Sequence, residues 1–437
     1  MKRVLIISYY WPPSGGSGVQ RWVKFAKYLP EEGWLPVIYT PENPELIAVD
    51  RTLEQEIPDE AEILRKRIIE PYGIYRRLLG KQSAADGGSN EVNPVNSQKK
   101  TFMQKASLFI RGNFFIPDPR CVWIWPSVCF LKKYLKDNPV DIIVSTGPPH
   151  SMHLIARHIS KALDIPWIAD FRDPWTRMFY FKHLSLSGYA LKKHKKLEKK
   201  VLDDASAVVA VSPLVQREFQ EMTSTPVELI TNGYDESDFS DTVVESDGYF
   251  NITHTGLFAS DGNPDVLWKV LAEKCAEDKE FSDMMRIRLV GKTDKEVSAS
   301  IERSGLGRHI RDNGYQPHLV AVKEQKSASM LILPLRKEPE YKATIPGKLF
   351  EYMASGNPIL GIGQTDGAMA SIIGSTKTGT VADWDDEKTI SEFIDNCWQR
   401  FKSGSSESEN DNISQYSRRA LAGKMAALMY SLLRQDK

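Results

Sequence analysis

Short apolar runs alternate with longer amphipathic stretches along most of the chain. The run at residues 4–8 is rich in β-branched residues and too short for a helix, so it predicts a buried strand. Stretches such as 19–29 and 154–163, with apolar residues at helical spacing, predict the intervening helices. Further strands are expected at 36–40, 142–146, 166–170, 207–211, 227–231, 250–255, 287–290, 330–333 and 358–362. Buried strands that alternate with helices are typical of parallel sheets covered on both faces, so the pattern predicts an α/β fold.

The alternation is interrupted by a polar segment at residues 234–248 that has no strand pattern. A chain of 437 residues also suits two domains better than one. We therefore expect two doubly wound domains, at residues 1–236 and 245–414, followed by a final helix at about 415–437. Residues 81–100 are rich in Ser, Gly, Asn, Ala and Gln, a composition that predicts a mobile loop in the first domain.

Charge and cysteine content exclude several classes of protein. The 57 Lys and Arg residues balance the 57 Asp and Glu residues, so no overall charge favours nucleic acid. Basic residues outnumber acidic ones at 99–136, which indicates either an anionic surface or substrate, or only a solvated helix face. The four cysteines lack metal-ligand or redox spacing. No apolar run is long enough to span a bilayer, so we expect a cytoplasmic protein, with attachment to the inner face of the plasma membrane as an alternative.

Candidate chemistry in the first domain lies after predicted strands, where open parallel sheets bind ligands. Gly16 precedes a predicted helix whose free N–H groups could hold a phosphate, with a simple tight turn as the alternative. Arg21 stands where a dinucleotide motif needs its third glycine, which argues against NAD. His150 follows another strand and could donate to a sugar hydroxyl or a phosphate, or be a structural histidine.

A cluster of charges at residues 170–175 (DFRDPW) directly follows a predicted buried strand. Charges at such a position are costly unless they are paired or used. We expect Arg172 to contact a phosphate and Asp173 to bind acceptor hydroxyls. The alternative is a structural corner in which Asp170 pairs with Arg172.

In the second domain, Gly256 and Lys292 follow the first two predicted strands. Glycine after a strand allows a ligand to approach the backbone, and Lys292 could reach a phosphate or the base, with turn formation as the alternative.

The segment 342–358 gives the most specific signal in the second domain. We expect Thr344 to cap a helix that runs to residue 355 and stops at a glycine. Gly347 and Lys348 at its N-terminus would hold a diphosphate. Glu351 lies one turn further, where its carboxylate could accept both ribose hydroxyls.

Residues 12–16 (PPSGG), 170–175 (DFRDPW) and 346–353 (PGKLFEYM) resemble, in this order, glycosyltransferase family 4, a retaining family with the GT-B fold. The resemblance implies two facing Rossmann-like domains with a cleft between them, a final helix that packs back on the first domain, a donor held by the second domain and an acceptor held by the first. Glu351 matches the ribose-binding glutamate of the family, Gly16 its glycine loop, and Lys348 a lysine found in one of its branches. The branch that looks most similar builds bacterial surface polysaccharides on lipid carriers.

The expected function is therefore transfer of a hexosyl group from a nucleoside-diphosphate sugar to a glycan or lipid-linked acceptor, without a metal or other cofactor. The expected partners are the nucleotide sugar, the acceptor and an anionic membrane surface, but no nucleic acid. Ala343 stands where most members of the family have a second glutamate. Two alternatives remain open, a sugar-nucleotide epimerase of the same fold and a non-catalytic partner subunit.

Overall fold

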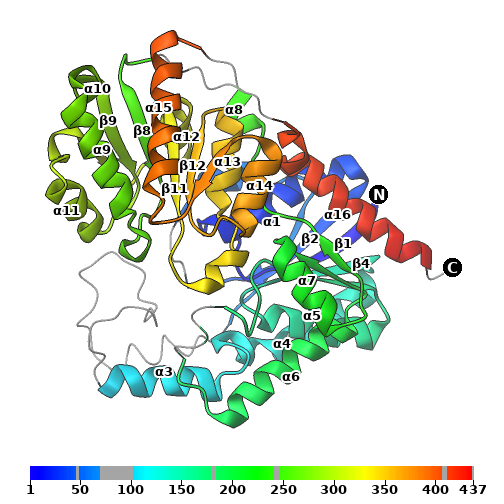
Figure 1. Cartoon of the computed structure of the whole chain (residues 1–437). Coiled ribbons are helices and arrows are strands. Elements are labelled where there is room, and N and C mark those ends of the chain that lie inside the picture. The colour runs from blue at the N-terminus through cyan, green and yellow to red at the C-terminus, as the bar shows by residue number, and fades with distance from the viewer. Residues whose placement is uncertain are drawn as a thin grey trace. The chain divides into compact units, whose positions relative to one another are not determined.

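The computed structural model in Figure 1 describes residues 1–45, 49–68, 102–178, 181, 184–240, 244, 246–405 and 411–435. The loop predicted at 81–100 lies outside these residues. The chain forms two compact units, of which the first comprises Met1–Thr231 together with Arg418–Lys437 and the second comprises Asn232–Ser417. The chain therefore leaves the first unit after Thr231 and returns to it at Arg418.

The first unit is built on a seven-stranded parallel sheet of order β3-β2-β1-β4-β5-β6-β7. Its strands are β1 Lys2–Ile7, β2 Trp34–Pro41, β3 Glu62–Lys66, β4 Ile142–Gly147, β5 Trp167–Phe171, β6 Ala207–Ala210 and β7 Val227–Leu229. Its helices are α1 Ser17–Tyr28, α3 Phe102–Phe114, α4 Ile124–Asp137, α5 Ser151–Leu163, α6 Gly188–Asp204, α7 Pro213–Met222 and α16 Arg418–Gln435.

Helices α1 and α16 pack together over one face of this sheet. Trp22 and Val23 of α1 are fully buried, and so are Met425 and Met429 of α16, in one core with strand residues such as Ile6. The last helix of the chain is thus part of the hydrophobic core of the first unit.

The second unit has a six-stranded parallel sheet of order β10-β9-β8-β11-β12-β13. Its strands are β8 Phe250–Thr255, β9 Met285–Val290, β10 Ile310–Gly314, β11 Met330–Pro334, β12 Ile359–Ile362 and β13 Gly379–Ala382. Its helices are α8 Ser237–Ser240, α9 Asp265–Glu277, α10 Lys279–Met284, α11 Lys295–Arg303, α12 His318–Lys326, α13 Gly347–Ser355, α14 Ala368–Thr376 and α15 Glu387–Ser403. Its apolar residues form a separate core.

The two doubly wound sheets that the sequence predicts are confirmed. In each sheet the order of strands reverses at one point, between β1 and β4 in the first unit and between β8 and β11 in the second. Connections that leave these neighbouring strands diverge to opposite sides, which leaves room for a ligand beyond their carboxyl ends. The candidate sites should therefore be sought at these two points.

Candidate functional site

In the second unit, the order of strands reverses between β8 and β11, and we call this place the switch point. Two glycines in close contact lie beside it. Gly256 follows β8 with φ +86°, and Gly291 follows β9 with φ +135°. A Cβ atom on Gly291 would lie 2.3 Å from the carbonyl oxygen of Gly256, a distance that no side chain can accept. The Gly256 N–H donates to the Val290 carbonyl at 2.7 Å. Glycine at these positions therefore fixes the path of the chain after β8.

Helix α13 begins at the same end of the sheet, directly after Pro346, which is its N-cap residue. The prediction that Thr344 caps this helix is therefore wrong. Thr344 instead ends the short 3-10 helix Pro339–Ala343, and its N–H donates to the Tyr341 carbonyl at 2.9 Å. The predicted end of α13 is confirmed, since Gly356 is left-handed with φ +78°. Gly347, as expected, lies in the first turn.

Lys348 in the first turn of α13 reaches back to the end of β8. Its Nζ lies 3.1 Å from Nε2 of His254 and 3.2 Å from the Leu257 carbonyl oxygen. A Cβ atom on Gly256 would lie 3.2 Å from the same Nζ, so the glycine leaves room for the ammonium group. The structure thus brings together two residues predicted for the donor, Gly256 and Lys348, with His254, which the sequence did not indicate.

The surroundings of this ammonium group change its proton affinity. Burial lowers the pKa of Lys348 to about 8, and the nearby Glu351 carboxylate opposes part of that shift. Burial, and after it the positive charge of Lys348, holds the pKa of His254 well below its usual range. At neutral pH the pair therefore consists of a charged ammonium and a neutral imidazole.

Glu351 is held in place by contacts that involve two other segments, α12 and the end of β8. Its Oε2 accepts from Nε2 of Gln325 at 3.0 Å, and the same amide donates to Oγ1 of Thr255 at 3.0 Å. The hydroxyl of Tyr352 accepts from the Thr255 N–H at 2.8 Å. These contacts tie α12 and α13 to the end of β8 and orient the carboxylate. No sequence motif indicated Gln325 for this role.

Lys292 follows Gly291, and its backbone adjoins the loop that follows β8. Its side chain is exposed, and its carbonyl oxygen accepts from the Phe258 N–H at 2.9 Å. No hydrogen bond or ion pair links its ammonium to the described residues around Lys348.

In the first unit, Arg172 lies against the N-terminus of α1. Gly16 precedes this helix with φ +104°, and a Cβ atom on Gly18 would lie 2.1 Å from Nη1 of Arg172. Nη2 of Arg172 donates to the Pro148 carbonyl at 3.1 Å. The guanidinium and the positive end of the helix dipole meet here, an arrangement that favours an anion.

The expected alternative pairing of Asp170 with Arg172 is wrong. Both side chains of the pair Arg21 and Asp170 are fully buried, with Nη2 to Oδ1 at 2.8 Å and Nε to Oδ2 at 3.1 Å. Trp22 Nε1 adds a third bond to this carboxylate at 2.7 Å, and Arg21 Nη1 donates to the Thr231 carbonyl at 2.7 Å. Because Arg21 neutralises Asp170, Arg172 is left for another role.

His150 and Asp173 lie in the same loop region after β4 and β5. The His150 ring stacks on Trp175 with centroids 4.7 Å apart, and neither ring nitrogen bonds to a described residue. Burial, helped by the charges of His153, Arg172 and His194, holds the pKa of His150 well below its usual range.

Asp173 is partly exposed, with Oδ2 3.8 Å from Nε of Arg172. Desolvation raises the pKa of its carboxyl, and Arg172 opposes that shift. Arg172 thus lies between the N-terminus of α1 and this carboxylate.

Two further properties concern metals and membranes. Among the described residues, no three His, Cys, Asp or Glu side chains are grouped as metal ligands. Within the same ranges, no helix combines the length and apolar character needed to cross a bilayer.

Comparison with known proteins identifies the class. Residues 96–238 match the family described as Glycosyltransferase Family 4, and residues 250–400 match the one described as Glycosyl transferases group 1. A search among curated proteins finds no significant sequence match.

Several solved structures share the fold. A glycosyltransferase from Rickettsia africae aligns with a TM-score of 0.62 and 15% identity over 99% of both chains. WaaG, a glycosyltransferase involved in lipopolysaccharide biosynthesis, aligns with a TM-score of 0.57 and 13% identity over 98% of this chain and 99% of that one. HepE from Anabaena, in complex with UDP-glucose, aligns with a TM-score of 0.54 and 13% identity over 100% of this chain and 98% of that one.

The first match lies almost wholly in the first unit and the second match lies in the second unit, and together they span more than half of the chain. The chain contains a Glycosyltransferase Family 4 domain and a Glycosyl transferases group 1 domain, has the GT-B fold and is a glycosyltransferase, as the sequence predicted.

Proposed function

We propose that this enzyme transfers a sugar, with retention of anomeric configuration, from a nucleoside-diphosphate sugar to a glycan or lipid-linked acceptor in bacterial surface polysaccharide synthesis. The observation that carries this proposal is the Lys348 ammonium beside Gly256 at the start of α13. That a protein of the same fold is seen with UDP-glucose, and that WaaG acts in lipopolysaccharide biosynthesis, supports the choice of donor and pathway class.

The donor would bind at the switch point of the second unit. The first-turn N–H groups of α13 and the ammonium of Lys348 would contact the diphosphate, because both present positive charge to an anion. Glu351 lies one turn further along the helix, and Gln325 fixes only one of its oxygens. The other oxygen accepts no hydrogen bond from a described residue, so it is available to a ribose hydroxyl.

The chemical step requires stabilisation of the leaving diphosphate, whose negative charge grows as the glycosidic bond breaks. Fixed positive charges aimed at such a group stabilise the transition state more than the ground state. We assign this role to Lys348 and the α13 dipole, which would serve where other enzymes use a metal ion. In the first unit, Arg172 at the N-terminus of α1 would present its own positive charge to an anion.

The acceptor would bind to the first unit, near Asp173 and His150. Asp173 is partly exposed and can accept hydrogen bonds from sugar hydroxyls. The two ring nitrogens of His150 are buried and the ring stacks on Trp175, so His150 would contact the acceptor only after a local rearrangement.

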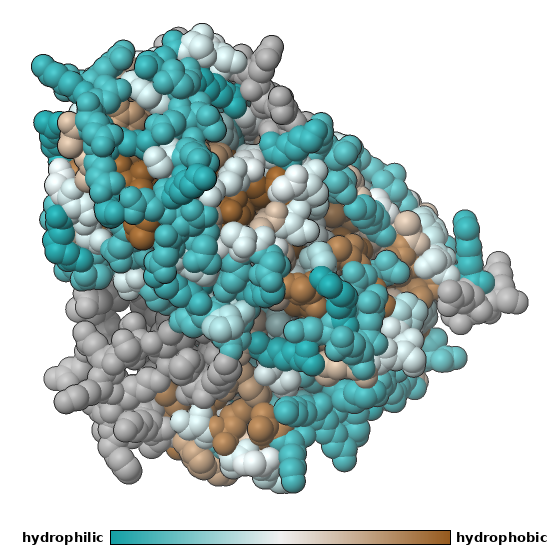
Figure 2. Space-filling view, in the orientation of Figure 1, coloured by the Kyte–Doolittle hydropathy of each residue, from teal (hydrophilic) through white to brown (hydrophobic). Residues whose placement is uncertain are grey.

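We also propose that the first unit attaches to the anionic cytoplasmic face of the plasma membrane. Helices α3 and α6 are joined by the Asn113 side chain, which accepts from the Ser187 N–H at 2.7 Å. Apolar side chains are exposed on α3 and at the start of α6, and apolar residues gather at the lower edge of the view in Figure 2, where these helices lie in Figure 1. The exposed apolar side chains on α3 and at the start of α6 are Phe109, Ile110, Phe114 and Tyr189.

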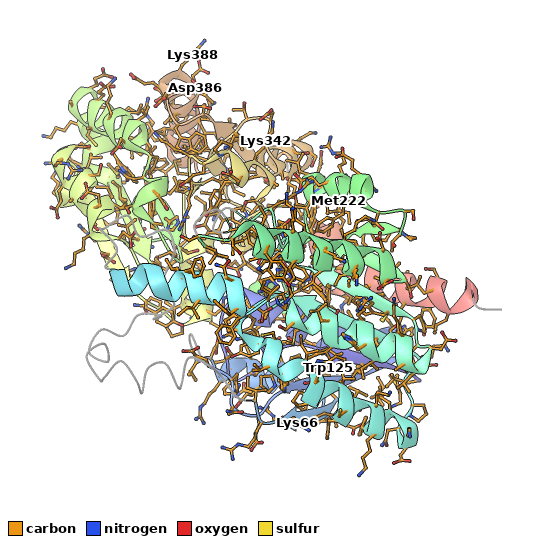
Figure 3. All side chains as sticks on the ribbon, turned by 90° about the horizontal axis from the view of Figure 1, so that it is seen from below. Lys66, Trp125, Met222, Lys342, Asp386 and Lys388 are labelled. Carbon is orange, nitrogen blue, oxygen red and sulfur yellow. The ribbon has the colours of Figure 1, made fainter. Side chains whose placement is uncertain are left out.

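Exposed lysines follow on α6, at 192, 193, 195, 196, 199 and 200. On α4, the exposed Trp125 labelled in Figure 3 is followed by Lys132, Lys133 and Lys136. Such combinations bind anionic bilayers. Co-sedimentation with vesicles containing phosphatidylserine should weaken when Lys132, Lys133 and Lys136 are all changed to Glu, and unchanged co-sedimentation would count against this surface.

A thermal-shift screen tests the proposed donor. UDP, GDP and their sugars should raise the melting temperature of the unmodified chain, and Glu351→Gln should reduce that shift because it weakens the ribose contact. Asp395→Asn, a substitution on the exposed face of α15, is the matched control and should bind nucleotide normally. If no nucleoside diphosphate stabilises the unmodified chain, the proposed donor site is wrong.

A further inference from the structure

The last residues of β8 place a histidine under the candidate donor site. His254 is the penultimate residue of this strand, and only 2% of its surface is exposed. Its Nε2 faces the Lys348 ammonium at 3.1 Å, and its ring lies 4.3 Å from that of Phe258, between centroids. A buried histidine that contacts a cation instead of an anion is an unusual arrangement that needs a physical explanation.

The geometry determines which protonation state of this imidazole can exist. An ammonium group can only donate, so Nε2 must be the acceptor and the ring proton must be on Nδ1. Nδ1 has no hydrogen-bond partner among the described residues. A second proton would place two positive charges in contact, and burial further disfavours it. His254 therefore stays neutral while Lys348 is charged.

The remaining contacts of Lys348 show what this acceptor does. Nζ has a second acceptor in the Leu257 carbonyl at 3.2 Å, and Glu351 contributes a favourable charge interaction. The carbonyl lies on the loop after β8, and the Glu351 carboxylate, which interacts with Lys348 through its charge, lies on α13 itself. The two hydrogen bonds to His254 Nε2 and the Leu257 carbonyl hold the flexible Lys348 side chain in one position, next to Gly256. One of the three N–H donors of the ammonium group then remains for a ligand.

We propose that His254 is a positioning residue for the donor diphosphate: its neutral Nε2 holds the Lys348 ammonium above Gly256, with the remaining donor directed at a phosphate oxygen. This role rests on the proposed function, since it assumes that the diphosphate binds at the start of α13. His254 itself does not touch the donor in this arrangement and acts through Lys348.

The test compares variants of the full chain by titration calorimetry with UDP and, in parallel, GDP. His254→Phe keeps the ring shape and removes the acceptor, and it should weaken binding about ten-fold, as expected for the loss of a hydrogen bond to a charged group. His254→Gln places an amide oxygen near the position of Nε2 and should restore most of the affinity. In a Lys348→Met background, His254→Phe should cause no further loss, because its effect passes through the lysine.

A pH series separates positioning from a general structural effect. The hydrogen bond to Nε2 stabilises the charged form of Lys348, so its loss should move the decline in affinity at high pH to a lower pH. Unchanged affinity of His254→Phe, an undiminished loss in the Lys348→Met background, or a pH profile that does not move would each overturn the role of His254. The proposed donor function would survive these results, and would fail only if the unmodified chain bound neither nucleotide.

Discussion

At the level of single residues, the fully buried ion pair of Arg21 and Asp170 contributes to the stability of the first unit. Burial alone would raise the pKa of Asp170, but the charge and hydrogen bonds of Arg21 outweigh it and lower that pKa. The stability that the pair supplies is therefore present at neutral pH and is lost as the pH falls through the lowered pKa. The sequence could not reveal this pair, because 149 positions separate its members.

Removal of one partner from this pair should be strongly destabilising. Arg21→Met leaves Asp170 buried without a counter-charge, and we expect a loss of about 3–5 kcal/mol in the free energy of unfolding. Lys199→Met, which removes the exposed ion pair with Asp203 on α6, is the control and should have a much smaller effect. Chemical denaturation followed by tryptophan fluorescence measures both. Equal stability of the two variants would contradict the assignment of Arg21.

The lowered pKa of Lys348 leads to a prediction on nucleotide binding. As the pH rises through about 8, the free protein loses the ammonium charge, so its affinity for UDP or GDP should fall. Lys348→Arg keeps its charge throughout, so any affinity it retains should stay nearly constant up to about pH 9.5. Titration calorimetry across this range is the measurement. A decline of the same size and midpoint in the arginine variant would mean that another group titrates.

The candidate site was predictable where its residues share one helix. Gly347, Lys348 and Glu351 follow from a single segment, because the N-terminus of a helix and its next turn face the same way. His254 and Gln325 come from β8 and α12, and only the folded sheet brings them to that helix. An isolated histidine in a buried strand is indistinguishable in sequence from a core residue.

At the level of elements, the strands that the sequence failed to predict all lie at sheet edges. β3 ends the first sheet, and β10 and β13 end the second on its two sides. Their residues are largely half-buried or exposed, as in β10, where three of five positions are exposed. Apolar runs mark strands that are buried on both faces, so the central strands were predicted and these edge strands were not.

The close contact between Gly256 and Gly291, in the loops after β8 and β9, can be tested with two alanine substitutions. Gly305→Ala meets only backbone strain at φ +82°, since no atom lies within 4 Å, and should cost about 1–2 kcal/mol. Gly291→Ala adds a clash with the Gly256 carbonyl, which should cost about 1–3 kcal/mol more. Nucleotide affinity should fall only in the Gly291 variant, because Gly256 adjoins Lys348. Equal melting temperatures and affinities for the two variants would contradict this account.

At the level of the whole molecule, the chain returns to its first unit through α16. The buried side chains of this helix share a core with β1 and α1. The first unit therefore consists of two segments that are separated in sequence by the entire second unit.

The contribution of α16 can be measured with neighbouring substitutions. Met425→Ala creates a cavity in the core of the first unit and should lower its stability by about 2–5 kcal/mol. Lys424→Ala, on the exposed side of the same helix, should change the stability by less than about 0.5 kcal/mol. Thermal unfolding of the full chain compares them. A Met425 variant as stable as the Lys424 variant would mean that the helix is dispensable for this core.

This connectivity determines the order in which the nascent protein can mature. A ribosome synthesises all seven strands of the first sheet well before it makes α16, so that sheet leaves the exit tunnel with part of its apolar face uncovered. All residues of the second unit and of its apolar core are made before α16, so that core can form earlier. The first unit is thus translated first but completes its core last. Until α16 is made, its uncovered apolar face can bind a chaperone that recognises apolar surface.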